Sequence, residues 1–153
     1  SNIGLTTTDM NIGWSAATGT PDGYIVLRTT AVGAYPDTDP VDGTPYTAGN
    51  TLGNATVMYV GSSVTAAIAS LTAGSQYSYE IYSYNGNPTN ATVNYRTTSP
   101  LQGQAYTLAL EPTAHSSAFS VASYGSTTIT FNIQALSGIT NAAGYNILYK
   151  TGT

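Results

Sequence analysis

An all-β sandwich of short antiparallel strands is the fold class that the sequence predicts, and three observations support it. Apolar and polar residues alternate along several short stretches, which is the pattern of strands with one buried face. Clusters of Pro, Gly, Asn and Asp separate these stretches. No stretch shows the 3.6-residue period of an amphipathic helix, and a series of short strands joined by turns is typical of a sandwich.

The first strand is expected at residues 6–15, where Met10, Ile12 and Trp14 share one face and polar residues share the other. A turn follows at residues 20–23, because its proline presets φ and its glycine accepts a positive φ. The sequence therefore predicts a half-buried strand followed by a turn.

The remaining strands follow in the same way. A long connection rich in Pro, Asp and Gly occupies residues 31–54, with a short edge strand expected near Tyr46. The other strands are expected at residues 24–30, 56–60, 64–68 and 76–84, and the last strand, or a broken pair, between residue 93 and about residue 108.

Part of the sequence occurs twice. Residues 22–29 return as residues 143–150, and residues 10–14 have a counterpart in residues 129–133. Each copy contains an alternating strand, a turn and a second alternating strand, and such repetition is typical of modular arrays. We therefore expect one complete sandwich in residues 1–108, a short junction in residues 109–113, and the first three strands of an incomplete second module in residues 114–153.

One segment has a more specific signature. Leu71-Thr72-Ala73-Gly74-Ser75-Gln76-Tyr77 resembles the Leu-x-x-Gly-Thr-x-Tyr corner of fibronectin type III domains, with serine in the threonine position. The resemblance implies that Tyr77 is a tyrosine-corner residue, whose hydroxyl bonds backbone a few residues upstream. It also implies that Leu71, Trp14 and Tyr24 belong to the core.

The resemblance covers residues 1 to about 108, and residues 112–153 match the first three strands of such a domain, with Ile133 in place of Trp14. The segment that contains Pro40 to Tyr46 resembles a subgroup from large secreted bacterial surface proteins. That resemblance implies an extracellular or cell-surface location.

The incomplete module is expected to need a partner, because so short a segment cannot bury enough surface to offset the ordering of its chain. A longer chain, a partner chain, or packing against the first module by another arrangement would each cover it. We expect its contact residues to be aliphatic and aromatic, namely Phe119, Ile129, Phe131, Ile133, Tyr145, Ile147, Leu148 and Tyr149.

Composition narrows the possible partners. Charged residues make up 7% of the chain and the net charge is -4. The cations Arg28, Arg96 and Lys150 form no basic run, which argues against nucleic acid and anionic membranes as partners. There is no cysteine for disulfide or thiolate chemistry, and no run long and apolar enough to insert into a membrane.

Few residues suggest catalysis, and no cofactor is expected. His115 is the single histidine, so neither a histidine-bearing triad nor a two-histidine metal site can form within one chain. Glu80 and Glu111 are not paired as glycosidase carboxylates would be. A weak calcium motif is present at Asp37, Asp39 and Asp42, although a proline interrupts it and no bidentate glutamate follows.

Two further features concern the surface. Tyr82, Tyr84, Tyr95 and Tyr106 could present rings for stacking on sugars or for a protein contact, although tyrosine also fills the faces of sandwiches. Asn54 and Asn90 begin N-x-Thr sequences that fit the N-glycosylation pattern.

These observations favour a non-enzymatic structural subunit of an extracellular fibre or surface array. Its second module would be completed by a neighbouring copy or by an adjacent segment of a longer chain. The alternative is a spacer, or a carbohydrate- or protein-binding module, of a secreted adhesin or polysaccharide-degrading enzyme. Self-association distinguishes the two hypotheses, since a spacer remains monomeric.

Overall fold

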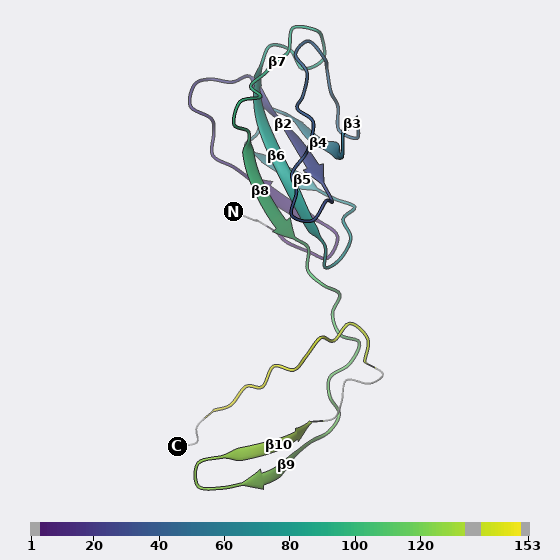
Figure 1. Ribbon diagram of the computed structural model, residues 1–153, viewed down its shortest axis with the longest axis vertical. Helices are drawn as coiled ribbons and strands as arrows, with labels where there is room; N and C mark the ends of the chain where they lie inside the picture. The colour runs from purple at the N-terminus through teal and green to yellow at the C-terminus, as the bar shows by residue number, and fades with distance from the viewer. Residues whose placement is uncertain (1–3, 134–138, 151–153) are drawn as a thin grey trace. The chain divides into compact units, whose positions relative to one another are not determined.

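The computed structural model describes residues 4–133 and 139–150, and within these ranges the chain is all β with no helix. The chain divides into two compact units, Ser1–Leu108 and Ala109–Thr153 (Figure 1). No helix of the described part is long and apolar enough to cross a membrane. Each unit is described by itself below.

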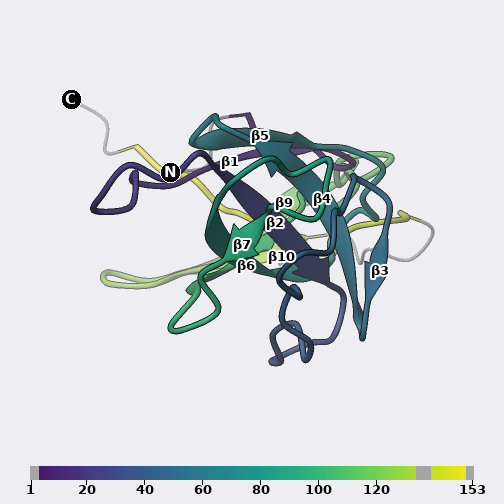
Figure 2. The same cartoon turned by 90° about the horizontal axis from the view of Figure 1, so that it is seen from above.

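Unit 1 contains two antiparallel sheets. Six strands form the larger sheet, in which the order β3-β4-β2-β6-β7 is extended by β8 on the same edge of β6. This sheet curls into a half-barrel, and β1 and β5 pair separately beside it (Figure 2). The strands are β1 Met10–Gly13, β2 Gly23–Thr29, β3 Thr51–Leu52, β4 Ala55–Gly61, β5 Thr65–Ile68, β6 Gln76–Asn85, β7 Asn94–Tyr95 and β8 Leu101–Tyr106.

The first core lies between the two sheets. Because side chains alternate along each strand, every second residue of these strands points into this core. Met10 and Ile12 of β1 meet Val26 of β2 and Tyr79 of β6 there. Trp14 is half-buried at the edge of this core, with its ring edge-on to that of Tyr24 at 5.6 Å. Of the expected core residues, Tyr24, Leu71 and Tyr77 are buried.

The tyrosine corner contains the expected hydrogen bond. The backbone N–H of Thr72 donates to the hydroxyl of Tyr77 over 2.7 Å. Thr107 closes the same corner from the end of β8, because its hydroxyl donates to the carbonyl of Thr72 over 2.6 Å. Two polar side chains thus satisfy backbone groups that the turn between β5 and β6 leaves unpaired.

The first strand is shorter than predicted, because residues 6–9 form a turn. The hydroxyl of Thr6 accepts the backbone N–H of Asp9 over 2.8 Å, and the backbone N–H of Thr6 donates to the carbonyl of Asp9 over 2.9 Å. Such local side-chain bonds compete with strand pairing. The edge strand is also displaced, from near Tyr46 to Thr51–Leu52, since Pro45 cannot donate to a strand ladder.

The second face of the large sheet is buried as well, which the alternation did not predict. Ile25 and Leu27 point to this face, and residues from the long connections cover them. The same cluster contains Tyr82, Tyr84 and Tyr95, each less than 5% exposed. The expectation that these three rings present a binding surface is therefore wrong, because the connections fold over the sheet instead of extending into solvent.

The buried tyrosines should be visible in an alkaline titration. Burial raises the pKa of Tyr79 to about 12, and it raises the pKa of Tyr95 to about 12 as well. Because these folded-state values lie above the ordinary tyrosine value of about 10, their stabilisation is complete below pH 10 and is lost as pH rises toward 12. We expect phenolate absorbance to appear in two phases, with the later one reduced by Tyr79→Phe and by Tyr95→Phe. A single phase near the ordinary value would contradict this burial.

Unit 2 contains one hairpin, formed by β9 Phe119–Tyr124 and β10 Ile129–Ile133, with a bulge opposite Thr130 and Phe131. A third strand was expected at residues 143–150, but these residues, all of them described, form no strand. In unit 1 the equivalent strand β2 pairs with β4 on one edge and with β6 on the other. The described part of unit 2 contains no strand in either position, so the backbone of residues 143–150 has no ladder to join.

Candidate assembly surface

The hairpin of unit 2 has one apolar face. Phe119 lies opposite Ile133, and Val121 lies opposite Phe131, so these four side chains share one side of the two-stranded sheet. The rings of Phe119 and Phe131 are 5.1 Å apart. Phe119 is nevertheless 64% exposed. The described residues of unit 2 therefore pair the apolar side chains with one another without covering them.

The internal repeat provides a matched comparison between the two units. Val26 and Leu27 of unit 1 correspond to Ile147 and Leu148 of unit 2. The two residues of unit 1 are 0% exposed, whereas Ile147 is 53% exposed and Leu148 is 88% exposed. Similar side chains in the same sequence pattern are thus buried in one unit and exposed in the other.

The hairpin shows the same contrast. Met10 corresponds to Ile129 and Ile12 to Phe131. Both residues of β1 are buried, whereas both residues of β10 are exposed. The strands that bury β1 and β2 in unit 1 are β4, β5, β6 and β8. The described part of unit 2 contains no equivalents of these strands.

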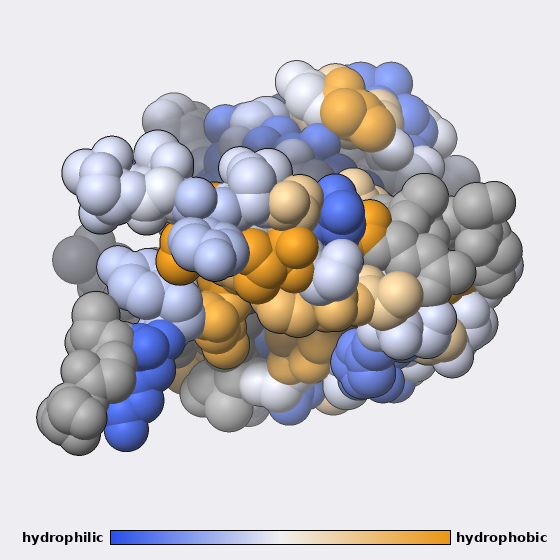
Figure 3. Space-filling view, turned by 90° about the horizontal axis from the view of Figure 1, so that it is seen from below, coloured by the Kyte–Doolittle hydropathy of each residue, from blue (hydrophilic) through white to orange (hydrophobic). Residues whose placement is uncertain are grey.

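A groove of about 490 Å³ lies on this surface. Its lining includes Phe119 and Ile133, at the ends of β9 and β10, and also Tyr145, Ile147 and Leu148. Figure 3 shows apolar side chains, in orange, among hydrophilic ones on the face that it displays. The concave shape and largely apolar lining of the groove suit the side chains of an added strand.

No charged residue of the hairpin blocks the addition of another strand. The residues from 109 to 153 include Glu111, His115 and Lys150 as their titratable acid and base side chains, and β9 and β10 contain no charged residue and no proline. Natural sheets usually block exposed edges with such residues. The hairpin lacks these blocking features, so another strand can approach it without electrostatic cost.

The predicted interface residues of unit 2 are largely exposed. Tyr149 is 89% exposed, Tyr145 is 43% exposed, and Ile133 is half-buried. We call Phe119, Ile129, Phe131, Ile133, Tyr145, Ile147, Leu148 and Tyr149 the apolar set of unit 2.

The three aspartates of the weak calcium motif do not converge. The carboxylate of Asp37 accepts the backbone N–H of Asn54 over 3.0 Å, which lowers the pKa of Asp37. Asp39 accepts the hydroxyl of Tyr82 over 2.7 Å, and Asp42 accepts the backbone N–H of Tyr95 over 2.7 Å. Each carboxylate fixes the long connection to a different point of unit 1. The described residues contain no group of three acidic, histidine or cysteine side chains that could hold a metal.

The two glycosylation candidates are both exposed. Asn54 lies in the turn between β3 and β4, where its side-chain oxygen accepts the backbone N–H of Asp37 over 3.2 Å. The side-chain oxygen of Asn90 accepts both the backbone N–H and the hydroxyl of Thr92, over 2.9 and 2.6 Å.

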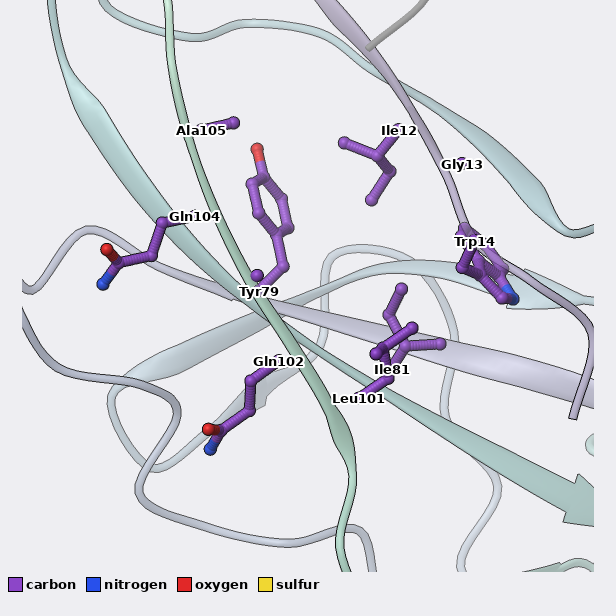
Figure 4. Close-up of a pocket in the computed structure, with 10 residues that line it drawn as sticks. Ile12, Gly13, Trp14, Tyr79, Ile81, Leu101, Gln102, Gln104 and Ala105 are labelled. Atoms are coloured by element: carbon purple, nitrogen blue, oxygen red, sulfur yellow. The ribbon is translucent and has the colours of Figure 1, made fainter. Parts of the chain in front are cut away.

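Sequence reasoning missed a second groove, of about 310 Å³, in unit 1. Figure 4 shows Ile12 of β1 and Tyr79 of β6 on one side of β8, and Gln102 on the other side. The alternation of Gln102 and Gln104 with Gly103 and Ala105 in β8 was the available signal, because it places the glutamines on one face.

Comparisons of this chain with protein-family models, with curated proteins and with solved structures found no match.

Proposed function

We propose that this protein is a non-enzymatic structural subunit of an extracellular fibre or surface array. The observation that carries the proposal is the matched contrast between the units, in which repeat-equivalent side chains are buried in unit 1 and exposed in unit 2. Burying a large aliphatic side chain contributes about 1.5–3 kcal/mol, so the apolar set represents a substantial driving force for association.

The proposal includes a fibronectin type III-like sandwich for unit 1. Two features support it, namely the bond between Thr72 and Tyr77 and a two-sheet arrangement in which β1 and β5 lie apart from the curled sheet. Unit 2 would then be the start of a second such sandwich. Its missing strands come from a neighbouring copy or from another segment of a longer chain, and they pair with the backbone of residues 143–150 as β4 and β6 pair with β2.

The alternative, a spacer or binding module, loses part of its support because Tyr82, Tyr84 and Tyr95 are buried. Tyr106 remains 59% exposed, and a single exposed ring is a small surface for stacking on a glycan.

Electron microscopy and sedimentation of the full chain test the proposal. We expect filaments or ordered arrays with a regular axial repeat, because the apolar set of each copy would be covered by the next copy. Separate monomers at all accessible concentrations would overturn assembly between copies. That result would instead favour a spacer whose second module is completed within one polypeptide.

A further inference from the structure

The large sheet of unit 1 has one long free edge, which is formed by β8. This strand pairs with β6 along Leu101–Tyr106, and no strand of the described part of the chain pairs with its other edge. Five of its six residues are exposed. The edge strands β3 and β7 of the same sheet are two residues long, and such short edges offer little backbone for pairing.

The backbone groups of β8 alternate between its two edges, as they do in any antiparallel ladder. The N–H of Thr107, just after β8, donates to the carbonyl of Ser75, just before β6, over 3.0 Å. Counting back in twos from Thr107, the backbone groups of residues 105, 103 and 101 bond to β6. The outward-facing N–H and C=O groups within β8 are therefore those of Gln102, Gln104 and Tyr106.

The devices that usually protect an exposed strand edge are absent from β8. Its sequence, Leu-Gln-Gly-Gln-Ala-Tyr, contains no charge and no proline, and its register against β6 runs without a bulge. An added Cβ at Gly103 would meet no atom within 4 Å, so the space beside the middle of the strand is open. The side chains of Gln102 and Gln104 extend on the side of β8 away from Trp14 (Figure 4). The edge is thus accessible, regular and neutral.

We propose that β8 forms a two-fold contact with a second copy of this chain, in which the β8 strands of the two copies pair in antiparallel orientation. A two-fold axis brings the same edge of both copies together, so charges of one sign there would meet their own kind and repel. The chain has a net charge of -4, yet no charged residue lies in β8. The outward donors and acceptors of one strand meet those of the identical strand, and the two large sheets become one continuous sheet.

A two-fold axis at Gly103 gives this contact a register. Residues 101–105 of the two copies are then paired, and Gln102 of each copy exchanges backbone hydrogen bonds with Gln104 of the other. Leu101, which is 51% exposed, lies opposite Ala105 of the second copy and is covered by the contact. The contact is separate from the apolar set of unit 2, so it does not depend on the proposed polymer.

Hydrogen exchange of single backbone amides in the full-length protein tests the proposal, because β8 contains its own control. The amides of residues 103 and 105 bond to β6 within one copy and should exchange slowly at every protein concentration. The amides of Gln102 and Gln104 should exchange rapidly in dilute protein, and about 10-fold more slowly when about nine-tenths of the copies are paired. Equal exchange rates of these two amides in dilute and concentrated protein would overturn the proposal.

Opposite charges at position 104 identify the strand that pairs with β8. With the axis at Gly103, residue 104 of one copy and residue 104 of the other are diagonal neighbours, about 7–8 Å apart. At low salt, Gln104→Lys alone and Gln104→Glu alone should each weaken the pairing about two- to five-fold through repulsion. An equimolar mixture of the two variants should restore it. The readout is the protein concentration at which the amide of Gln102 becomes protected.

Gln104→Ala is the matched control, because it loses the same side-chain hydrogen bonds to Gln76 and Ser78 without adding a charge. This variant should pair nearly as well as the wild type. Slow exchange of residues 103 and 105 shows in each variant that β8 still pairs with β6. A mixture that pairs no better than either charged variant alone would mean that β8 pairs with a different strand, and it would overturn the two-fold contact.

Discussion

Replacing Ile147 by aspartate is expected to abolish assembly of the full chain. Ile147 is equivalent to Val26, which is completely buried in unit 1, so completion of unit 2 should bury it in the same way. The substitution removes about 1.5–3 kcal/mol of apolar burial and adds an unpaired buried carboxylate that costs several kcal/mol more. A loss of about 4 kcal/mol weakens association about 1,000-fold, which sedimentation velocity and electron microscopy would detect as loss of polymers.

Thr130→Asp is the matched control, because it introduces the same charge into unit 2 at the position that corresponds to Asn11, which is exposed in unit 1. This variant should assemble nearly as well as the wild type. The fluorescence of Trp14, which lies in unit 1, should be unchanged in both variants if unit 1 remains folded. Unimpaired polymers of Ile147→Asp would show that residues 143–150 do not form the contact.

Replacing Gly86 by alanine is expected to destabilise unit 1 by about 3–5 kcal/mol. Gly86 follows β6 with φ of +89°, a conformation that side chains with a Cβ rarely adopt. An added Cβ would also collide with the backbone carbonyl of Thr92, which cannot move without disturbing the turn before β7. The loss is a large part of the roughly 5–15 kcal/mol that stabilises a typical domain. Urea unfolding followed by Trp14 fluorescence measures it.

Two other glycines separate the causes of this effect. Gly49 has φ of +96° with no atom within 4 Å of an added Cβ, so Gly49→Ala reports the cost of the backbone conformation alone, about 1–2 kcal/mol. Gly103 in β8 has neither the positive φ nor the collision, and Gly103→Ala should change stability by no more than about 0.5 kcal/mol. Equal effects at positions 86 and 49 would mean that the turn near Thr92 adjusts freely.

Local periodicity was sufficient to predict most strands of unit 1. Residues 76–84 alternate so regularly that β6 was expected within one residue of Gln76–Asn85. The bond from Thr72 to Tyr77 was implied by the resemblance that one short motif carries. These features depend on neighbouring residues, so the sequence contains the necessary information within a short window.

Features that depend on distant residues were not predicted. Nothing near Tyr82 in the sequence reveals that Asp39 lies 2.7 Å from its hydroxyl, because the two residues meet only when the long connection folds over the sheet. The alternation in β6 likewise led to the expectation of one solvated face, whereas coverage by residues such as Val93 and Leu52 buries both. The third strand of unit 2 was expected from its own pattern, and it is missing because strand formation also requires a neighbouring strand to pair with.

The difference between the two units has a consequence for how a polymer would grow. Unit 1 brings its own covering strands, and unit 2 exposes the apolar set. A row of such subunits joined through unit 2 therefore has two unlike ends, one with an uncovered groove and one without. Growth should therefore be directional. The fold of each unit 2 would be completed only when the next subunit binds. Folding of unit 2 and elongation of the polymer would then be one concentration-dependent step.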